Sequence, residues 1–176
     1  MTVQIKVYEM TGTPGNKVPV EIGNLNFKST DLVAANYVYY PIRSGNYSFQ
    51  RYIYFTVIVS GTNISAARAP KLIITQTQTA DNGATVSLSY KVKNTFSTPG
   101  INVESDMVPV TLGQEIALNV SDTSLELATS VSTLISKDVF YYTNYLMFQA
   151  TATAAAGTNA GNGPSFNFKF NIKTYE

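Results

Sequence analysis

Apolar and polar residues alternate with a period of two along most of the chain, which is the pattern of β-strands with one buried face. Val3, Ile5 and Val7 alternate with polar neighbours near the start, and a second alternation surrounds Leu25 and Phe27. The last run has an apolar face and a polar face, made by Phe166, Phe168, Phe170 and Ile172 and by Asn167, Lys169, Asn171 and Lys173. These patterns predict half-buried strands, and helical periodicity is nearly missing.

The stretch from Tyr37 to Val59 differs because its second half is apolar or aromatic on both faces. From Arg51 onward the two faces are Ile53, Phe55, Val57 and Val59, and Tyr52, Tyr54, Thr56 and Ile58. Strands with this pattern lie in the interior of a sheet and are covered on both sides. We therefore predict a central strand that begins near Arg51.

Turn signals predict how some strands connect. Asp81-Asn82-Gly83 separates two apolar runs, Lys71–Thr79 and Ala84–Val92, and Asn and Gly accept the positive φ of a tight turn. We expect a hairpin there. The run Val139–Thr153 is too long for a regular strand, and its polar pair Thr143-Asn144 predicts a bulge.

Shorter patterns predict further turns. Val108, Val110 and Leu112 precede a Gly113-Gln114 turn, after which apolar positions alternate again up to Val120. The loop Gly12–Lys17 lacks the spacing of a phosphate-binding loop, and its Pro14-Gly15 centre favours a hairpin.

Three segments lack a clear strand pattern. Ser124–Ile135 carries apolar residues at helical spacing but is rich in Ser and Thr, so helix and strand-and-loop both remain open. Asn94–Asp106 and the small-residue tract Ala154–Pro164 are expected to be linkers.

Composition agrees with a sheet-rich globular protein. The chain has 176 residues, of which 13% are charged, and contains no Cys. This length fits one domain that needs no disulfide. We predict a single domain over residues 1–176 with an all-β fold, an antiparallel β-sandwich of the jelly-roll or Ig-like type with about eight to ten strands.

Candidate catalytic groups are sparse. The chain has no His and no Cys, which excludes Ser-His-Asp and Cys-His nucleophile systems and the usual zinc sites. Glu104-Ser105-Asp106 offers oxygen ligands, but no calcium-binding loop motif surrounds it, so a solvated loop is the simpler interpretation. We expect a protein that is not an enzyme and that binds no metal or cofactor.

The charge pattern argues against nucleic acid and membrane partners. The formal net charge is +1, and Lys and Arg are scattered along the chain. Such a chain has no basic patch for a phosphate backbone. No window approaches the apolar length of a membrane span or of a signal peptide.

Tyrosine and arginine are concentrated around the predicted central strand, at Tyr39, Tyr40, Tyr47, Tyr52, Tyr54, Arg43 and Arg51. Strand packing, a protein interface, and stacking of sugars or bases are three uses of such a set. As candidate interface residues we name Tyr39, Tyr40, Arg43 and Tyr47.

The tract Ala154–Pro164 also allows two interpretations. It is either a plain linker or an arm that orders against a neighbouring subunit. Ala154, Gly157, Asn159 and Gly161 are its candidate interface residues.

Several segments together resemble a family of small structural proteins of tailed bacteriophages. The segments are IKVYEMTG, LNFKSTD, YPIRSGNYSFQRYIYFTV, KDVFYYTNYLMFQATATAAAG and the ending FNFKFNIKTYE. The sequence departs from the family pattern at Met10, where Trp is expected, and in its middle region. The shared motifs are structural and carry no catalytic residues.

The resemblance implies a non-enzymatic virion component that binds major capsid or other neck and tail proteins in many copies, with self-association in the particle. Capsid decoration (cement) is the first expectation, and a neck, collar or tail protein is the alternative. A glycan- or host-receptor-binding module is the rival from another class, with Tyr47 or Tyr52 in its site. A carboxylate-dependent hydrolase, which needs two close carboxylates with perturbed pKa values, is the enzymatic rival.

Overall fold

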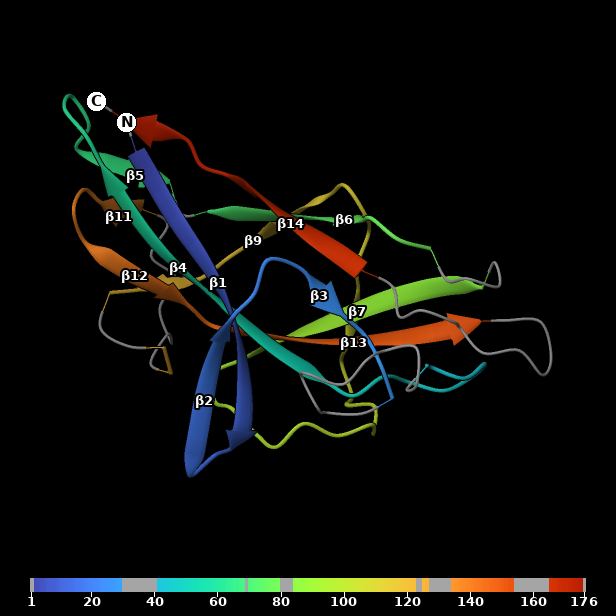
Figure 1. Ribbon diagram of the computed structural model, residues 1–176. Helices are drawn as coiled ribbons and strands as arrows, with labels where there is room; N and C mark the ends of the chain where they lie inside the picture. The colour runs from blue at the N-terminus through green and yellow to red at the C-terminus, as the bar shows by residue number, and fades with distance from the viewer. Residues whose placement is uncertain are drawn as a thin grey trace.

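The computed structural model describes residues 2–29, 41–68, 70–79, 84–122, 125–126, 134–153 and 165–175 (Figure 1). Within them the chain forms strands and no helix, so that no helix long and apolar enough to span a membrane occurs there. The strands are β1 (Thr2–Thr13), β2 (Asn16–Glu21), β3 (Leu25–Asn26), β4 (Arg51–Ser60), β5 (Ala66–Arg68), β6 (Lys71–Gln76), β7 (Thr85–Lys93), β8 (Val108–Pro109), β9 (Glu115–Ala117), β10 (Val120–Ser121), β11 (Leu134–Ser136), β12 (Phe140–Thr143), β13 (Tyr145–Thr153), β14 (Ser165–Asn171) and β15 (Thr174–Tyr175).

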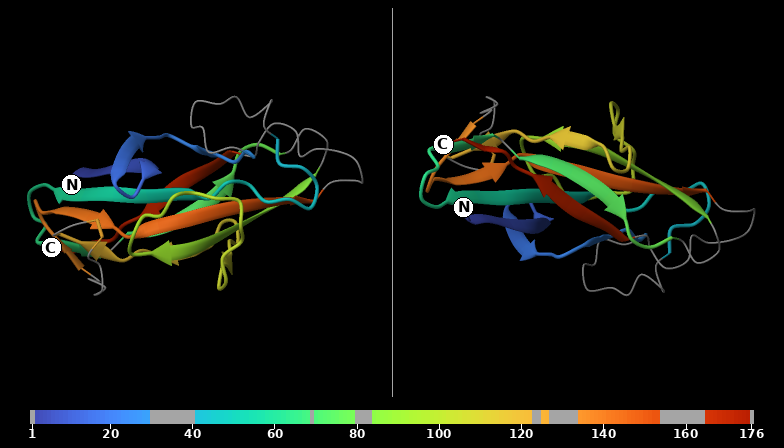
Figure 2. Two further views of the ribbon diagram at one scale, coloured as in Figure 1. Left: turned by 90° about the horizontal axis from the view of Figure 1, so that it is seen from below. Right: turned by 90° about the horizontal axis from the view of Figure 1, so that it is seen from above.

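Two antiparallel sheets face each other. The large sheet has eight strands, with β4 at its centre between β1 on one side and β12 and β13 on the other. The small sheet has four strands in the order β3-β14-β6-β9. Figure 2 shows in its right-hand view that β14 and β6 lie over β4 and β13. The predicted all-β, antiparallel, sandwich-like fold is confirmed.

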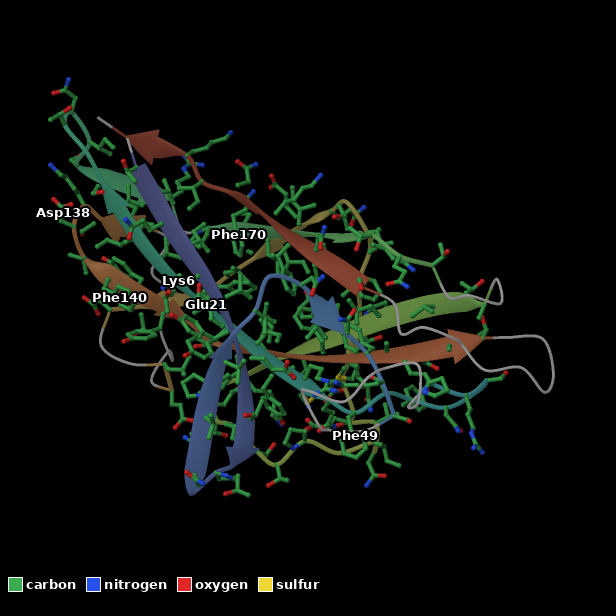
Figure 3. The ribbon with its side chains drawn as sticks, viewed as in Figure 1. Lys6, Glu21, Phe49, Asp138, Phe140 and Phe170 are labelled. Carbon is green, nitrogen blue, oxygen red and sulfur yellow. The ribbon has the colours of Figure 1, made fainter. Side chains whose placement is uncertain are left out.

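The main core lies between these sheets. Ile53 and Phe55 of β4 and Phe148 of β13 supply it from the large sheet, and Ile74 and Phe166 from the small sheet, all nearly inaccessible to solvent. The Phe55 ring contacts the rings of β14, where its centroid lies 4.8 Å from that of Phe170. Figure 3 shows Phe170 in this position and Phe140 on the outer side of the large sheet.

A second apolar cluster lies on the opposite, outer face of the large sheet. Tyr52 and Tyr54 of β4 pack there against Tyr145, Met147 and Met10. The prediction that β4 is covered on both faces is therefore confirmed, because Ile53 and Phe55 pack into the core between the sheets, whereas Tyr52 and Tyr54 pack into this outer cluster.

A small third sheet, in the order β11-β5-β15, closes one end of the sandwich. Val57 and Val59 of β4 pack there against Ala67 of β5, Ile135 of β11 and Tyr141 of β12. The segment Ser124–Ile135, for which helix and strand-and-loop were both open, ends in a strand, because Leu134 and Ile135 belong to β11. Most of its other residues lie outside the described residues.

The predicted bulge is confirmed at Thr143 and Asn144. Tyr142 pairs with Thr56 and Leu146 pairs with Ile53, so the chain advances four residues while its partner advances three. The Thr143 hydroxyl fills the interrupted ladder by accepting a hydrogen bond from the Phe55 N–H at 2.9 Å. The bulge therefore divides the predicted long strand into β12 and β13.

The predicted hairpin between Lys71–Thr79 and Ala84–Val92 is wrong. β6 pairs with β14 and β9 in the small sheet, whereas β7 pairs with β13 and β8 in the large sheet. The two strands thus belong to opposite layers. Asp81-Asn82-Gly83 lies outside the described residues.

Other turn predictions hold in part. β1 and β2 form the expected hairpin, with Thr13 paired to Asn16 around Pro14 and Gly15. The turn before Gln114 also forms, because Gln114 donates its N–H to the Thr111 carbonyl at 3.2 Å. However, the flanking runs become β8, β9 and β10, which pair with distant strands. Short elements of this kind bring the number of strands to fifteen within the described part of the chain, against the eight to ten expected.

Candidate protein interface

The segment that leads into β4 is held in place by the edge of β13. Ser48 donates its N–H to the Ala150 carbonyl at 2.8 Å, and the Ala150 N–H returns a bond of 3.0 Å to the Ser48 hydroxyl. Tyr47 forms a bridge with Thr151, and Ile42 is fully buried. The segment therefore continues the large sheet beyond the start of β4.

A tight turn presents Arg43 and Tyr47 to solvent. The Asn46 N–H bonds to the Arg43 carbonyl at 3.0 Å, and Gly45 takes a positive φ of 74°, which glycine adopts without strain. Gly45 also donates its N–H to the Ala152 carbonyl at 3.0 Å. Backbone bonds on both sides of the turn thus fix the positions from which these two side chains project.

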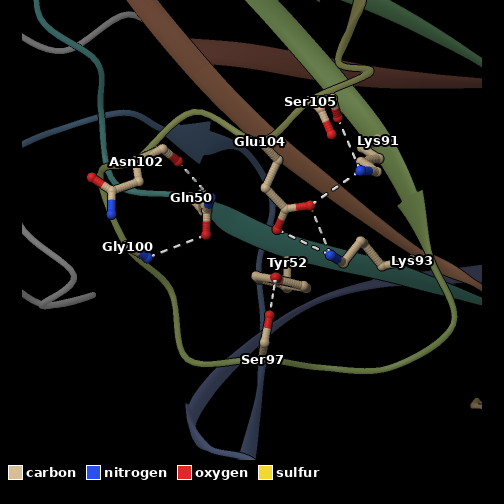
Figure 4. Close-up of polar contacts among 9 residues, drawn as sticks. All are labelled: Gln50, Tyr52, Lys91, Lys93, Ser97, Gly100, Asn102, Glu104 and Ser105. Carbon is tan, nitrogen blue, oxygen red and sulfur yellow. Dashed lines mark hydrogen bonds and ion pairs between the residues drawn. The ribbon is translucent and has the colours of Figure 1, made fainter.

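The segment from Asn94 to Met107 crosses the outer face of the large sheet and is not a free linker. Phe96 is buried, and its ring centroid lies 5.0 Å from that of Tyr52. The Tyr52 hydroxyl lies 2.5 Å from the Ser97 hydroxyl (Figure 4). The left-hand view of Figure 2 shows this segment over β4 and β13. It supplies the cover that buries the outer aromatic cluster.

Two buried glutamines join this outer segment to the segment before β4. The Gln50 amide donates to the Asn102 carbonyl at 2.9 Å and accepts from the Gly100 N–H at 3.2 Å (Figure 4). The Gln149 amide donates both to the Ser48 carbonyl and to the Ile101 carbonyl, at 2.9 and 3.1 Å. The Arg43–Ser48 turn and the backbone at Ile101 are therefore fixed relative to each other.

An open depression of about 480 Å³ lies where these two segments meet. Arg43 and Tyr47 line it from one side, and Ile101 and Asn102 line it from the other. The Tyr47 side chain is 42% exposed and Ile101 is 53% exposed. Tyr and Arg are residue types that are enriched at protein interfaces. We call Arg43, Tyr47, Ile101 and Asn102 the turn surface.

The structure brings together only part of the predicted site. Arg43 and Tyr47 lie on the turn surface, whereas Tyr39, Tyr40 and all four candidates of the small-residue tract (Ala154, Gly157, Asn159 and Gly161) lie outside the described residues. Tyr52, Tyr54 and Arg51 are buried, so for them packing is the correct interpretation. A glycan site that uses Tyr52 is thereby excluded.

Ile101 and Asn102 were not predicted from the sequence. They lie in a stretch too short to predict a strand. The available signal is that Ile101 and Val103 alternate with polar residues, and exposed apolar residues of this kind are common on protein surfaces.

Glu104 is engaged by lysines rather than open to a metal ion. Lys93 approaches its carboxylate at 2.8 Å, and Lys91 approaches it at 3.3 Å (Figure 4). The hydrogen bond from Lys93 lowers the pKa of Glu104 below its usual range. The loop at Glu104-Ser105-Asp106, expected to be solvated, is thus held to β7 by Lys91 and Lys93. Among the described residues, no cluster of acidic side chains is suited to a metal ion.

Glu126 occupies a similar position at the other end of the outer segment. Its carboxylate contacts the Lys17 ammonium and accepts hydrogen bonds from the Phe96 N–H and the Tyr145 hydroxyl. The Lys17 hydrogen bond lowers the pKa of Glu126, while burial raises the pKa of Tyr145. Burial also raises the pKa of Tyr54 to about 12, so both phenols are neutral at pH 7.

These carboxylates do not resemble the acid of a glycoside hydrolase. The pKa values of Glu104, Glu115 and Glu126 all shift downward, in each case chiefly because a lysine donates a hydrogen bond. A general acid that works near neutral pH needs an upward shift. The three residues are better suited to holding neighbouring segments together.

The lowered pKa of Glu126 predicts acid sensitivity. A depressed folded-state pKa contributes stability that is complete above the unfolded pKa, near 4.3, and is lost as pH falls through the folded value. We expect the free energy of unfolding to decrease from pH 5 toward about pH 3, and Glu126→Gln to flatten that decrease. Urea titrations across this pH range measure both. Identical pH profiles for the variant and the wild type would contradict the prediction.

Comparison of the chain with protein-family models, curated proteins and solved structures finds no match in any of the three.

Proposed function

We propose that this chain is a non-enzymatic structural component of a tailed-phage virion, where many copies bind other virion proteins. Capsid decoration is the first candidate, and a neck, collar or tail position is the alternative. The proposal starts from the sequence resemblance, whose motifs extend from IKVYEMTG near the start to FNFKFNIKTYE at the end.

The observation that carries this proposal is the turn surface. Its backbone is held by the edge of β13 and by the amides of Gln50 and Gln149, so the backbone has little freedom to lose on binding. A preorganised surface loses less entropy when a partner binds. Tyr47 and Arg43 are also of the types that most often dominate binding energy.

Removal of side chains from the turn surface tests the proposal. We expect Tyr47→Ala to weaken incorporation into particles, measured by co-sedimentation with assembled shells, by about tenfold or more, and Arg43→Ala to weaken it as well. Both variants should keep the unfolding midpoint of the wild type, because both side chains are exposed. Val18→Ala removes an exposed apolar side chain from β2 and serves as the control.

Two results would count against this function. Normal incorporation of both variants would remove the turn surface from the interface, and a wild-type protein that never co-sediments with shells, necks or tails would remove the virion role. Binding of a glycan that Tyr47→Ala abolishes would favour a receptor-binding module instead, since a depression of about 480 Å³ also suits a small sugar. A glycan array decides between the two.

A further inference from the structure

The N-terminal half of β1 is a sheet edge that no other described strand covers. β2 pairs with β1 only from Tyr8 to Thr13. Ile22 ends this pairing by donating its N–H to the Val7 carbonyl at 2.9 Å. On its other side β1 pairs with β4 from Thr2 onward. Figure 1 shows β2 beside only one half of β1, away from the N-terminus.

The direction of the Val7 carbonyl indicates which backbone groups of β1 point toward this open edge. The N–H and C=O of one strand residue point to the same side, and successive residues point to opposite sides. Since Val7 faces β2, Val3 and Ile5 face the open edge, whereas Gln4 and Lys6 face β4. The N–H and C=O groups of Val3 and Ile5 are thus oriented to accept another strand.

This edge lacks the features that usually prevent edge-to-edge pairing. Proline interrupts β2 at Pro19, and it ends the two-residue strand β8 at Pro109. From Thr2 to Ile5 there is neither proline nor charge. The Lys6 ammonium lies 3.1 Å from Glu21 of the same chain (Figure 3). Its charge is therefore compensated within the chain.

We propose that the segment Thr2–Lys6 pairs antiparallel with the same segment of a second copy, around a two-fold axis at Gln4. This register places Val3 opposite Ile5 of the other copy, so that their outward N–H and C=O groups bond to one another. Half-buried Val and Ile side chains then meet on one face. On the other face Thr2 lies opposite Lys6 and Gln4 opposite its own copy, so no like charges meet.

The short length of the paired segment sets the expected affinity. Pairing of Thr2–Lys6 buries less surface than a standard interface of about 1,600 Å². The dimer should therefore form reversibly at high-micromolar concentration and gain strength where many copies are held together. The inference concerns the isolated chain and holds or fails independently of the virion role.

Gln4 allows a charge-swap test by sedimentation equilibrium. Gln4→Lys and Gln4→Glu each place two like charges opposite each other across the axis, and each should raise the dimer dissociation constant about fivefold. An equimolar mixture of the two variants should associate at least as tightly as the wild type, because Lys then faces Glu. Thr13→Lys, an exposed position at the other end of β1, should leave the dimer unchanged.

A proline variant tests the backbone pairing itself. Ile5→Pro removes an N–H that faces the open edge, a place where strands tolerate proline, and should give a folded monomer. A wild type that stays monomeric at high-micromolar concentration would overturn the proposal. A dimer that survives both Gln4→Lys and Ile5→Pro would overturn it too, as would a mixture of the Gln4 variants no tighter than either alone.

Discussion

Replacement of Phe55 with Asp is expected to prevent folding. Phe55 is fully buried between the two sheets, with ring centroids 5.6 Å and 4.8 Å from those of Phe168 and Phe170. An unpaired carboxylate at this place costs several kcal/mol, against a total stability of about 5–15 kcal/mol for a domain. Circular dichroism and gel filtration of the variant should show an unfolded or aggregated chain.

Phe140 provides a matched control. The same change, Phe140→Asp, acts on a side chain that is 44% exposed on the outer face. This variant should fold, with an unfolding midpoint close to that of the wild type. A Phe55→Asp variant that unfolds at the wild-type midpoint would show that the sheets do not pack as described.

Removal of the carboxylate of Glu9 is expected to lower the free energy of unfolding by about 3–5 kcal/mol, the cost of breaking a buried ion pair. Arg51 is 1% exposed and Glu9 is 6% exposed, and Arg51 donates a hydrogen bond of 3.0 Å to the Glu9 carboxylate. Glu9→Ala leaves the Arg51 guanidinium inside the sandwich without this partner. Urea unfolding followed by tyrosine fluorescence measures the difference.

An exposed ion pair gives the comparison. Glu21→Ala breaks the contact between Lys6 and Glu21, both well exposed, and should leave the unfolding midpoint nearly unchanged. The double change of Glu9 to Leu and Arg51 to Met should recover much of the lost stability, because apolar residues can replace a buried pair. Equal effects of Glu9→Ala and Glu21→Ala would refute the expected role of burial.

Local pattern was sufficient to predict those elements whose evidence lies within one strand. The two apolar faces of β4, the alternating Phe residues of β14 and the bulge at Thr143-Asn144 were all visible in the sequence. Each depends on the side-chain period of two, which any strand obeys whatever its partner.

Strand partners could not be predicted in the same way. Asn82-Gly83 between two apolar runs favours a hairpin, yet β6 takes as its partner β14, which is nearly a hundred residues away in sequence. The turn residues are equally compatible with a crossing between layers. Burial of Leu72 and Ile74 against β14 and the large sheet decides the outcome, and that burial involves both halves of the chain.

The turn surface shows the same limit, whereas the buried ion pair outside it does not. Arg43 and Tyr47 were predicted, whereas Ile101 reaches them only through tertiary hydrogen bonds of Gln149. The buried ion pair of Glu9 and Arg51 has a signal in the sequence. Glu9 continues the alternating apolar face of Val3, Ile5 and Val7, and Arg51 begins the apolar face of β4. Opposite charges at the ends of two apolar faces are a signal of pairing inside a core.

The bulge at Asn144 also sets the parity of the strands on either side of it. Before it, even-numbered Phe140 and Tyr142 face outward, and after it, odd-numbered Tyr145 and Met147 do. A regular strand through Thr143 and Asn144, without the extra residue of the bulge, would instead turn Tyr145 and Met147 toward the inner face, opposite to Tyr142. The bulge therefore places the aromatic residues of β12 and of β13 on one and the same face of the sheet.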